Sequence, residues 1–196
     1  DADGRAAHSR AEALAAGITL LGENYVQEAK GKIAVATAPA EWHLIGHLQT
    51  NKAKYAVHLF HCIHSVDRWE LAAELDRRAK LANHHLNILI EVNVSGEKTK
   101  SGVPGADATA LVQRIAPLAS LTIRGLMTMV PYSDNPENSR PYFTALRKLK
   151  NEIAAQCIPR VQMDELSMGM TDDFTVAIEE GATIVRIGRA IFGARR

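Results

Sequence analysis

Glycines, a serine and two arginines stand at the ends of two apolar segments late in the chain, in a pattern suited to holding a phosphate. Ser167 and Gly169 close the first segment, whereas Arg186, Gly188 and Arg189 close the second. Glycines let the backbone approach a ligand, a hydroxyl and free amide N–H groups bind phosphate oxygens, and an arginine supplies the opposite charge. We therefore predict an anion site where the two segments end.

A strand–helix–strand unit must position this site. Residues 166–168 predict a short buried strand and residues 182–187 a second one. Between them, Thr171 is the expected N-cap of a helix, and the two aspartates after it carry the negative charge that a helix start favours. Gly181 is expected to end the helix in the left-handed conformation. In (β/α)8 barrels the loops after the seventh and eighth strands hold phosphate in the same way.

The chain before this unit repeats the same alternation of strands and helices. A capping-box pattern at Ser9 predicts a helix that ends at Gly17, and the segments that follow alternate between short β-branched runs and helical spacing. Such alternation indicates βαβ units and a parallel sheet. A doubly wound sheet would carry a glycine-rich loop after its first strand, and no GxGxxG is present there. Further strands are expected at residues 18–22, 42–46, 62–66, 87–94 and 121–127.

These seven strands predict an α/β fold of the (β/α)8 TIM-barrel type. Such a barrel has eight strands, and the helix at Ser9 precedes the first strand that is recognised. We therefore expect the first strand to lie ahead of Asp1. On this interpretation, residues 1–196 are a single, N-terminally shortened barrel domain.

Composition restricts the classes of function. The chain is 46% hydrophobic and 23% charged with a formal net charge of +1, and its basic residues are scattered, which argues against nucleic acid as a partner. No apolar run reaches membrane-spanning length and the N-terminus does not resemble a signal peptide. Cys62 and Cys157 stand in apolar settings without CxxC spacing and are expected as buried free thiols. We expect a cytoplasmic protein without a membrane partner.

Seven motifs together carry a specific resemblance. In chain order, from Gly22 to Arg195, they are GENYVQEAKGKI, WHLIGHLQTNKAKY, IHSVDRWELA, ILIEVNVSGEKTKSG, IRGLMTM, LSMGMTDDFTVAIEEG and VRIGRAIFGAR. The chain resembles the pyridoxal phosphate homeostasis protein family, whose members are barrels similar to the N-terminal domain of alanine racemases. The resemblance implies pyridoxal 5'-phosphate (PLP) in the barrel mouth and a role in balancing PLP, amino-acid and keto-acid pools, without firm catalytic turnover.

The resemblance also implies the residues of the cofactor site. Arg186 would face the pyridine nitrogen, with Ser167 and the backbone after Ile187 on the phosphate. The family has a small hydroxyl residue where this chain has Arg189, so a backbone contact survives there and a hydroxyl contact does not. The lysine that attaches PLP covalently has no match in residues 1–17 and is expected upstream of Asp1. The implied cofactor-binding residues are Asn24, His43, Ser167, Gly169, Arg186, Gly188 and Arg189.

Several alternatives stay open at this point. An amino-acid racemase is the enzymatic alternative, and a sugar-phosphate isomerase shares the fold class. His43 alone fits a core histidine, His64 a structural or surface one, and the loop lysines Lys98 and Lys100 either solvent or ligand contacts. The histidines lack tight metal-ligand spacing, so we expect no metal site. A monomer is expected, with apo forms of PLP-dependent enzymes as candidate partners.

Overall fold

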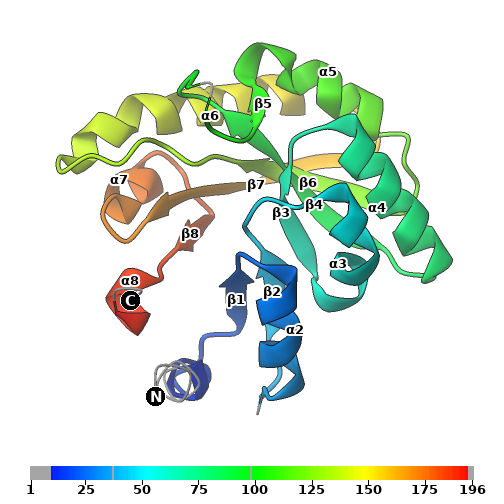
Figure 1. Ribbon diagram of the computed structural model, residues 1–196. Helices are drawn as coiled ribbons and strands as arrows, with labels where there is room; N and C mark the ends of the chain where they lie inside the picture. The colour runs from blue at the N-terminus through cyan, green and yellow to red at the C-terminus, as the bar shows by residue number, and fades with distance from the viewer. Residues whose placement is uncertain (1–9, 37, 98, 194–196) are drawn as a thin grey trace.

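A rolled parallel sheet forms the centre of the molecule. The computed structural model describes residues 10–36, 38–97 and 99–193. In this part of the chain, seven strands pair in parallel in the order β1-β2-β3-β4-β6-β7-β8, and the short β5 pairs with β4 off this path (Figure 1). The strands are β1 Leu20–Glu23, β2 Glu41–Leu44, β3 Cys62–Val66, β4 Leu86–Asn93, β5 Val103–Pro104, β6 Leu121–Met127, β7 Val161–Met170 and β8 Ile184–Arg186.

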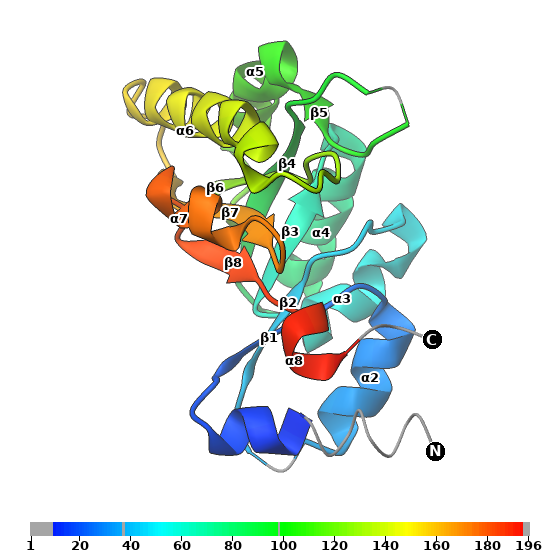
Figure 2. The ribbon, with the colours of Figure 1, turned by 90° about the vertical axis from the view of Figure 1, so that its left-hand side faces the viewer.

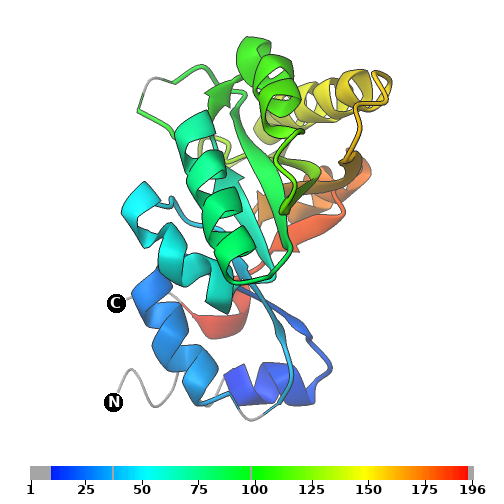
Figure 3. The same ribbon diagram turned by 90° about the vertical axis from the view of Figure 1, so that its right-hand side faces the viewer.

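Helices cover the outer face of the sheet, as the two side views show (Figures 2 and 3). β1 and β8 are the two ends of the strand order, and within the described residues no ladder joins them, so the barrel is nearly closed and open along one side. This arrangement confirms the predicted α/β barrel. The helices are α2 Val26–Ala34, α3 Ala53–Leu59, α4 Trp69–Leu81, α5 Gly105–Ile115, α6 Arg140–Ala154, α7 Phe174–Glu179 and α8 Arg189–Phe192, with 3-10 turns η1 Thr50–Lys52 and η2 Pro136–Ser139.

The two faces of the sheet carry different residues. Along β4, the residues Ile88, Ile90 and Val92 belong to the main apolar core between sheet and helices. The alternate positions Leu89 and Glu91 point the other way, because successive strand side chains face opposite sides. Leu89 joins a small separate apolar cluster with two other buried residues, Cys62 and Met127. The outer face therefore supplies most of the core, and the inner face is free to carry polar groups.

β7 is longer than the strand expected at residues 166–168. It begins at Val161, because its polar first half is held by main-chain pairing to β6 with a register shift, which hydrophobic patterning does not reveal. Gly125 permits this pairing. A Cβ built on Gly125 would lie 1.9 Å from the Glu165 carbonyl oxygen, so only glycine allows the two strands to approach so closely.

The strand–helix–strand unit at the end of the chain differs from expectation in its cap. The prediction of Thr171 as the N-cap is wrong, because the residue that precedes α7 is Asp173. The Asp173 carboxylate does not bond the first amides of α7. Its Oδ1 accepts from the Met170 amide at 2.7 Å, and its Oδ2 accepts from the Ser139 hydroxyl at 2.9 Å. Gly181 has the predicted left-handed conformation, with φ at +90°.

Other expectations can be placed briefly. The helix over residues 10–15 ends near Gly17, whose φ of +93° fits its predicted role, whereas its expected cap, Ser9, lies outside the described residues. β5 was not expected, because two residues that include a proline give no strand pattern. Within the described ranges, no helix combines the length and the apolar character needed to cross a membrane.

Candidate functional site

Four side chains from four strands form a continuous hydrogen-bonded line inside the barrel. Arg186 Nη1 on β8 donates to Ser167 Oγ on β7 at 2.7 Å, and Ser167 Oγ lies 3.0 Å from His64 Nδ1 on β3. His64 Nε2 lies 2.9 Å from His43 Nδ1 on β2. We call these four residues the buried polar chain. It crosses the inner face of the barrel and joins strands that are far apart in the sequence.

Both histidines of the buried polar chain are neutral at physiological pH. Burial lowers the pKa of His43 to about 4, with Glu41 acting in the opposite direction. Burial also lowers the pKa of His64 well below its ordinary value, and the neighbouring His43 and Arg186 lower it further. A neutral imidazole carries one N–H, so each ring donates through one nitrogen and accepts through the other. The proton positions along the chain are therefore linked.

This linkage controls the hydroxyl of Ser167. If His43 donates to His64 Nε2, then His64 Nδ1 donates to Ser167 Oγ, and the serine hydrogen is free to reach a ligand. In the opposite arrangement Ser167 donates to His64 and has no hydrogen left for a ligand. Arg186 donates to Ser167 Oγ in both cases. A bound anion thus favours the first arrangement.

Arg186 carries a positive charge whose hydrogen-bond partners are neutral. Its Nη2 donates to the Thr128 carbonyl at 2.8 Å and lies 3.1 Å from Met129 Sδ, in addition to the contact with Ser167. Among the described residues, no carboxylate forms an ion pair with it. Burial lowers its pKa to about 10, opposed by Glu91, so the guanidinium stays charged at neutral pH. A charge held in this way is available to an anionic or electron-rich ligand.

Glu91 adds a second titratable group to the inner face. It is 5% exposed, and its position on β4 places it opposite the outward core residues. Burial raises its pKa to about 7, with Asp67 adding to the effect and Arg186 opposing it. Sequence reasoning did not single out Glu91, and it interpreted His64 as a structural or surface residue. For Glu91 the available signal was its place between the apolar residues Ile90 and Val92 of a long strand.

Two of the predicted site residues have backbone roles in the structure. Asn24 follows the last residue of β1, and a Cβ on Gly46 would lie 2.3 Å from the Asn24 carbonyl oxygen, so the loops after β1 and β2 touch there. Gly169 has φ at +88°, and a Cβ on it would lie 2.5 Å from Ala177 Cβ. Glycine is thus required at 169 by its conformation and by the close packing of α7.

The other two predicted residues, Gly188 and Arg189, stand at the start of α8. The hydrogen bonds within α8 begin at Ile191 and Phe192, whose amides donate to the Gly188 carbonyl. The amides of the first two helical residues lie before this point and are not used by the helix itself. A Cβ on Gly188 would meet no atom within 4 Å, which leaves open space at this point. The Arg189 side chain pairs with Asp172, so its guanidinium is already engaged.

The structure therefore unites three of the predicted residues directly. His43, Ser167 and Arg186 share the buried polar chain, Gly188 and Arg189 follow β8, and the described contacts of Asn24 lead to Gly46 instead. The loop alternatives resolve in part: Lys100 Nζ lies 3.8 Å from Glu97 Oε2, and Lys98 is outside the described residues.

A cavity of about 510 Å³ lies at the opposite end of the strands. Its lining comes from the segments that precede β2 and β3 and from the adjoining parts of α2 and α3. It is distant in the fold from the carboxyl ends where the buried polar chain terminates, and we do not assign it to the same site. The lining residues include Ile33, Pro39, Trp42, His58 and His61.

Comparison with known proteins gives a consistent picture. The family model described as "Alanine racemase, N-terminal domain" matches residues 1–196. A pyridoxal phosphate homeostasis protein of Aquifex aeolicus is 48% identical over 181 residues, which cover 92% of this chain and 78% of that protein.

Solved structures agree in fold and in sequence. PipY of Synechococcus elongatus, in a structure without PLP, superposes with a TM-score of 0.89 at 39% identity, covering 95% of this chain and 87% of that one. The structure of PipY with PLP bound gives a TM-score of 0.87 at 38% identity, with the same coverage of 95% and 87%. The likeness thus extends over nearly the whole chain and includes a protein seen with its ligand.

Proposed function

Because this chain belongs to the pyridoxal phosphate homeostasis protein family, built on the alanine racemase N-terminal domain, we propose that it binds PLP at the carboxyl ends of its strands. We propose further that it serves the balance of intracellular PLP and of amino and keto acids. The single observation that carries the proposal is Arg186, a guanidinium inside the barrel mouth that bonds only neutral groups among the described residues.

The residues present fit a phosphorylated pyridine. Such a ligand needs charge-bearing or amide donors for its phosphate and a group that accommodates its ring nitrogen. Ser167 offers a hydroxyl whose hydrogen is free when the histidines donate toward it. The first amides of α8 and the open space at Gly188 offer a second set of donors with room for an approaching group.

Arg186 would control the protonation of the pyridine nitrogen of the ligand. Bound PLP would supply an aldehyde that reacts with amines and an electron-withdrawing pyridine ring. A permanent positive charge beside the pyridine nitrogen disfavours a second one, so that nitrogen stays unprotonated. Ring chemistry that depends on a protonated nitrogen is weakened as a result. This tuning supports carriage of the cofactor rather than rapid turnover, and apo forms of PLP-dependent enzymes are the recipients we propose.

His64 would act as a positioning residue, through Ser167. With His64 Nδ1 donating, Ser167 Oγ accepts from both His64 and Arg186 and directs its own hydrogen to the phosphate. His43 holds His64 in the required tautomer through the 2.9 Å contact. Both rings are buried, at 7% and 0% exposure for His43 and His64, so water does not compete for these bonds.

Equilibrium titration with PLP tests the binding site. Arg186→Met keeps an unbranched side chain of similar apolar character to the arginine stem and removes the guanidinium charge, and we expect PLP affinity to fall by about tenfold or more, as for loss of a charge-assisted contact. Arg140→Met is the matched control, because Arg140 also bonds several acceptors but lies on the outer surface between α6 and α7. Equal affinity for PLP in wild type and Arg186→Met would remove Arg186 from the site.

A cellular experiment tests the homeostatic role. In cells that lack the protein, we expect altered PLP and keto-acid pools, restored by the wild type and not by Arg186→Met at equal abundance. Full restoration by Arg186→Met would separate the role in homeostasis from PLP binding. The described residues give no feature that favours the racemase alternative. The monomeric state and the cytoplasmic location stay predictions.

A further inference from the structure

Two histidines and a cysteine meet on the inner face of the barrel, next to the proposed PLP site. One ligand atom from each of His43, Cys62 and His64 lies within 4.8 Å of the others. Among the described residues, these three side chains form a group that could hold a metal ion. All three are buried, at 7%, 5% and 0% exposure respectively. Sequence spacing did not suggest this group, because its members come from two strands.

Strand geometry places the three side chains on one face without strain. His43 and Cys62 are direct register partners of the parallel pair β2–β3. Cys62 and His64 are two residues apart on β3, so both project from the same side of the strand. Two neighbouring strands of a barrel form a stiffer base for ligands than loops do. The set is therefore preorganised by the backbone.

The ring nitrogens are also correctly directed. Ser167 Oγ is hydrogen-bonded to His64 Nδ1 at 3.0 Å. The other ring nitrogen, His64 Nε2, faces His43 Nδ1 at 2.9 Å. A ligating histidine typically has its other nitrogen held by such an outer hydrogen bond. Ligand atoms on a zinc tetrahedron lie about 3.3 to 3.6 Å apart, given the usual Zn–N and Zn–S lengths. His43 Nδ1 and His64 Nε2 are hydrogen-bonded to each other at 2.9 Å, so a metal ion would replace that bond, and the thiol would approach from within 4.8 Å.

Charged groups of both signs surround the cluster. Burial raises the pKa of the Cys62 thiol to about 12, with Glu165 and Glu41 adding to the effect and Arg124 opposing it, and Arg186 acts on His64. The thiol is therefore protonated without a metal, and a bound cation would have to displace its proton. Glu41 Oε2 lies 3.9 Å from His43 Nε2, on the side of the ring away from His64. A doubly charged ion among two neutral rings and one thiolate leaves one net positive charge, which these carboxylates are placed to offset.

We propose that His43, Cys62 and His64 form a binding site for a zinc-class divalent cation. Nitrogen and sulfur donors of this kind select zinc over magnesium or calcium. On binding, the Cys62 S–H bond breaks, the sulfur donates its electron pair to the metal, and the proton passes to solvent; no oxidation occurs. His43 and His64 also belong to the buried polar chain that positions Ser167, whereas Cys62 contacts none of the proposed cofactor residues by a hydrogen bond among the described residues, so metal binding can be measured through Cys62 without PLP.

Cobalt(II) is the probe that tests this site on the full chain. We expect the reduced wild-type protein to bind Co²⁺ with a thiolate-to-cobalt charge-transfer band and the visible bands of a tetrahedral ion, and added Zn²⁺ to bleach both. Cys62→Ser should lose the charge-transfer band and weaken Zn²⁺ affinity by about tenfold or more. Cys157→Ser is the matched control. The expectation that Cys157 is buried was wrong, because this free thiol lies exposed after the end of α6, so the variant should behave as wild type.

A second measurement keeps the test independent of how the variants fold. X-ray absorption at the zinc edge of the wild-type complex should show one sulfur and imidazole nitrogens in the first shell. The proposal is overturned if wild type gives no thiolate band, if Cys62→Ser retains it, or if the zinc spectrum lacks sulfur. Because each readout is of metal and not of PLP, failure here leaves the proposed function standing.

Discussion

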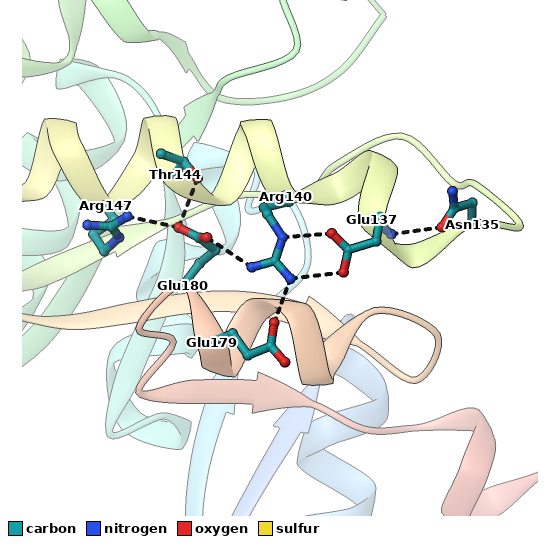
Figure 4. A network of polar contacts seen from close by, with 7 residues as sticks. All are labelled: Asn135, Glu137, Arg140, Thr144, Arg147, Glu179 and Glu180. Atoms are coloured by element: carbon teal, nitrogen blue, oxygen red, sulfur yellow. Dashed lines mark hydrogen bonds and ion pairs between the residues drawn. The ribbon is translucent and has the colours of Figure 1, made fainter.

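Two polar networks in this molecule contrast in charge and in burial. The outer network joins η2, α6 and α7: Arg140 bonds Glu137, Glu179 and Glu180, with Arg147 and Thr144 also on Glu180 (Figure 4). The buried polar chain has a single formal charge, on Arg186, and its remaining members are neutral. The network with more charges lies at the surface, and the one with fewer lies inside the barrel.

The contrast shows that burial, and not the number of charges, determines how much such a network contributes to the stability of the fold. Arg147, Thr144 and Arg140 lower the pKa of Glu180 to about 2, yet solvent and salt screen contacts of this kind, which contribute little to stability. Inside the barrel, a polar group that loses its hydrogen-bond partner is not rehydrated by water, so removing one partner is costly. We therefore expect changes in the buried polar chain to matter more.

The largest effect on stability is expected from His64→Leu. This change leaves buried His43 Nδ1 without its described partner, and Ser167 Oγ keeps only its contact with Arg186. The cost should be about 2 to 4 kcal/mol, for one buried polar group left unsatisfied and one further hydrogen bond lost. Urea unfolding measures it, with His84→Leu at an exposed position as the control. A loss no greater than that of the control would show that the buried contacts carry no such weight.

Next in size is the pH dependence of stability in Glu91→Gln. The folded pKa of Glu91 is raised to about 7 from 4.5, so its contribution is fully present at low pH and lost as pH rises through 7. His43 acts in the opposite direction. Its pKa is lowered from 6.5 to about 4, so its contribution to stability is present above pH 6.5 and is lost as the pH falls toward 4.

Removing Glu91 therefore leaves the histidine effect unopposed. Between pH 7 and pH 5, Glu91→Gln should lose stability on acidification more steeply than wild type, by about 1 kcal/mol per pH unit. Urea unfolding at several pH values measures the two slopes. Parallel curves for variant and wild type would mean that Glu91 does not titrate in the folded protein in this range.

Ser167→Ala should have a smaller effect, on ligand binding. The variant removes the hydroxyl that lies between Arg186 and His64 in the buried polar chain and keeps the Arg186 charge. We expect PLP affinity to fall by about 1 kcal/mol, the typical worth of one hydrogen bond. Calorimetric titration measures the change, and an affinity equal to that of wild type would exclude Ser167 from the phosphate contacts.

The smallest effect is expected from Arg140→Ala in the outer network. It breaks contacts to three carboxylates, of which Glu137 and Glu179 are exposed and Glu180 is partly buried, while Arg140 itself is one-third exposed. Unfolding should show a loss well below that of His64→Leu, and the loss should shrink further at high salt. A salt-independent loss as large as that of His64→Leu would reverse the ranking of the two networks.

Local patterns in the sequence were sufficient for most of the fold. β3 and β6 were predicted at the residues where they occur, 62–66 and 121–127, because each is a short β-branched or apolar run bounded by polar residues. Gly181 was predicted in the left-handed conformation that it adopts, since helix ends require it. These features depend on neighbours a few residues away, and the sequence states those neighbours directly.

Tertiary structure alone decided which polar residues meet. Ser167 is 103 residues from His64 and contacts it because curvature of the sheet brings the inner faces of β7 and β3 together. The register shift that lengthens β7 is likewise set by its pairing with β6 at Gly125. Periodicity reveals which face of a strand is apolar, but the partner across a barrel depends on strand order, register and closure, which no local pattern contains.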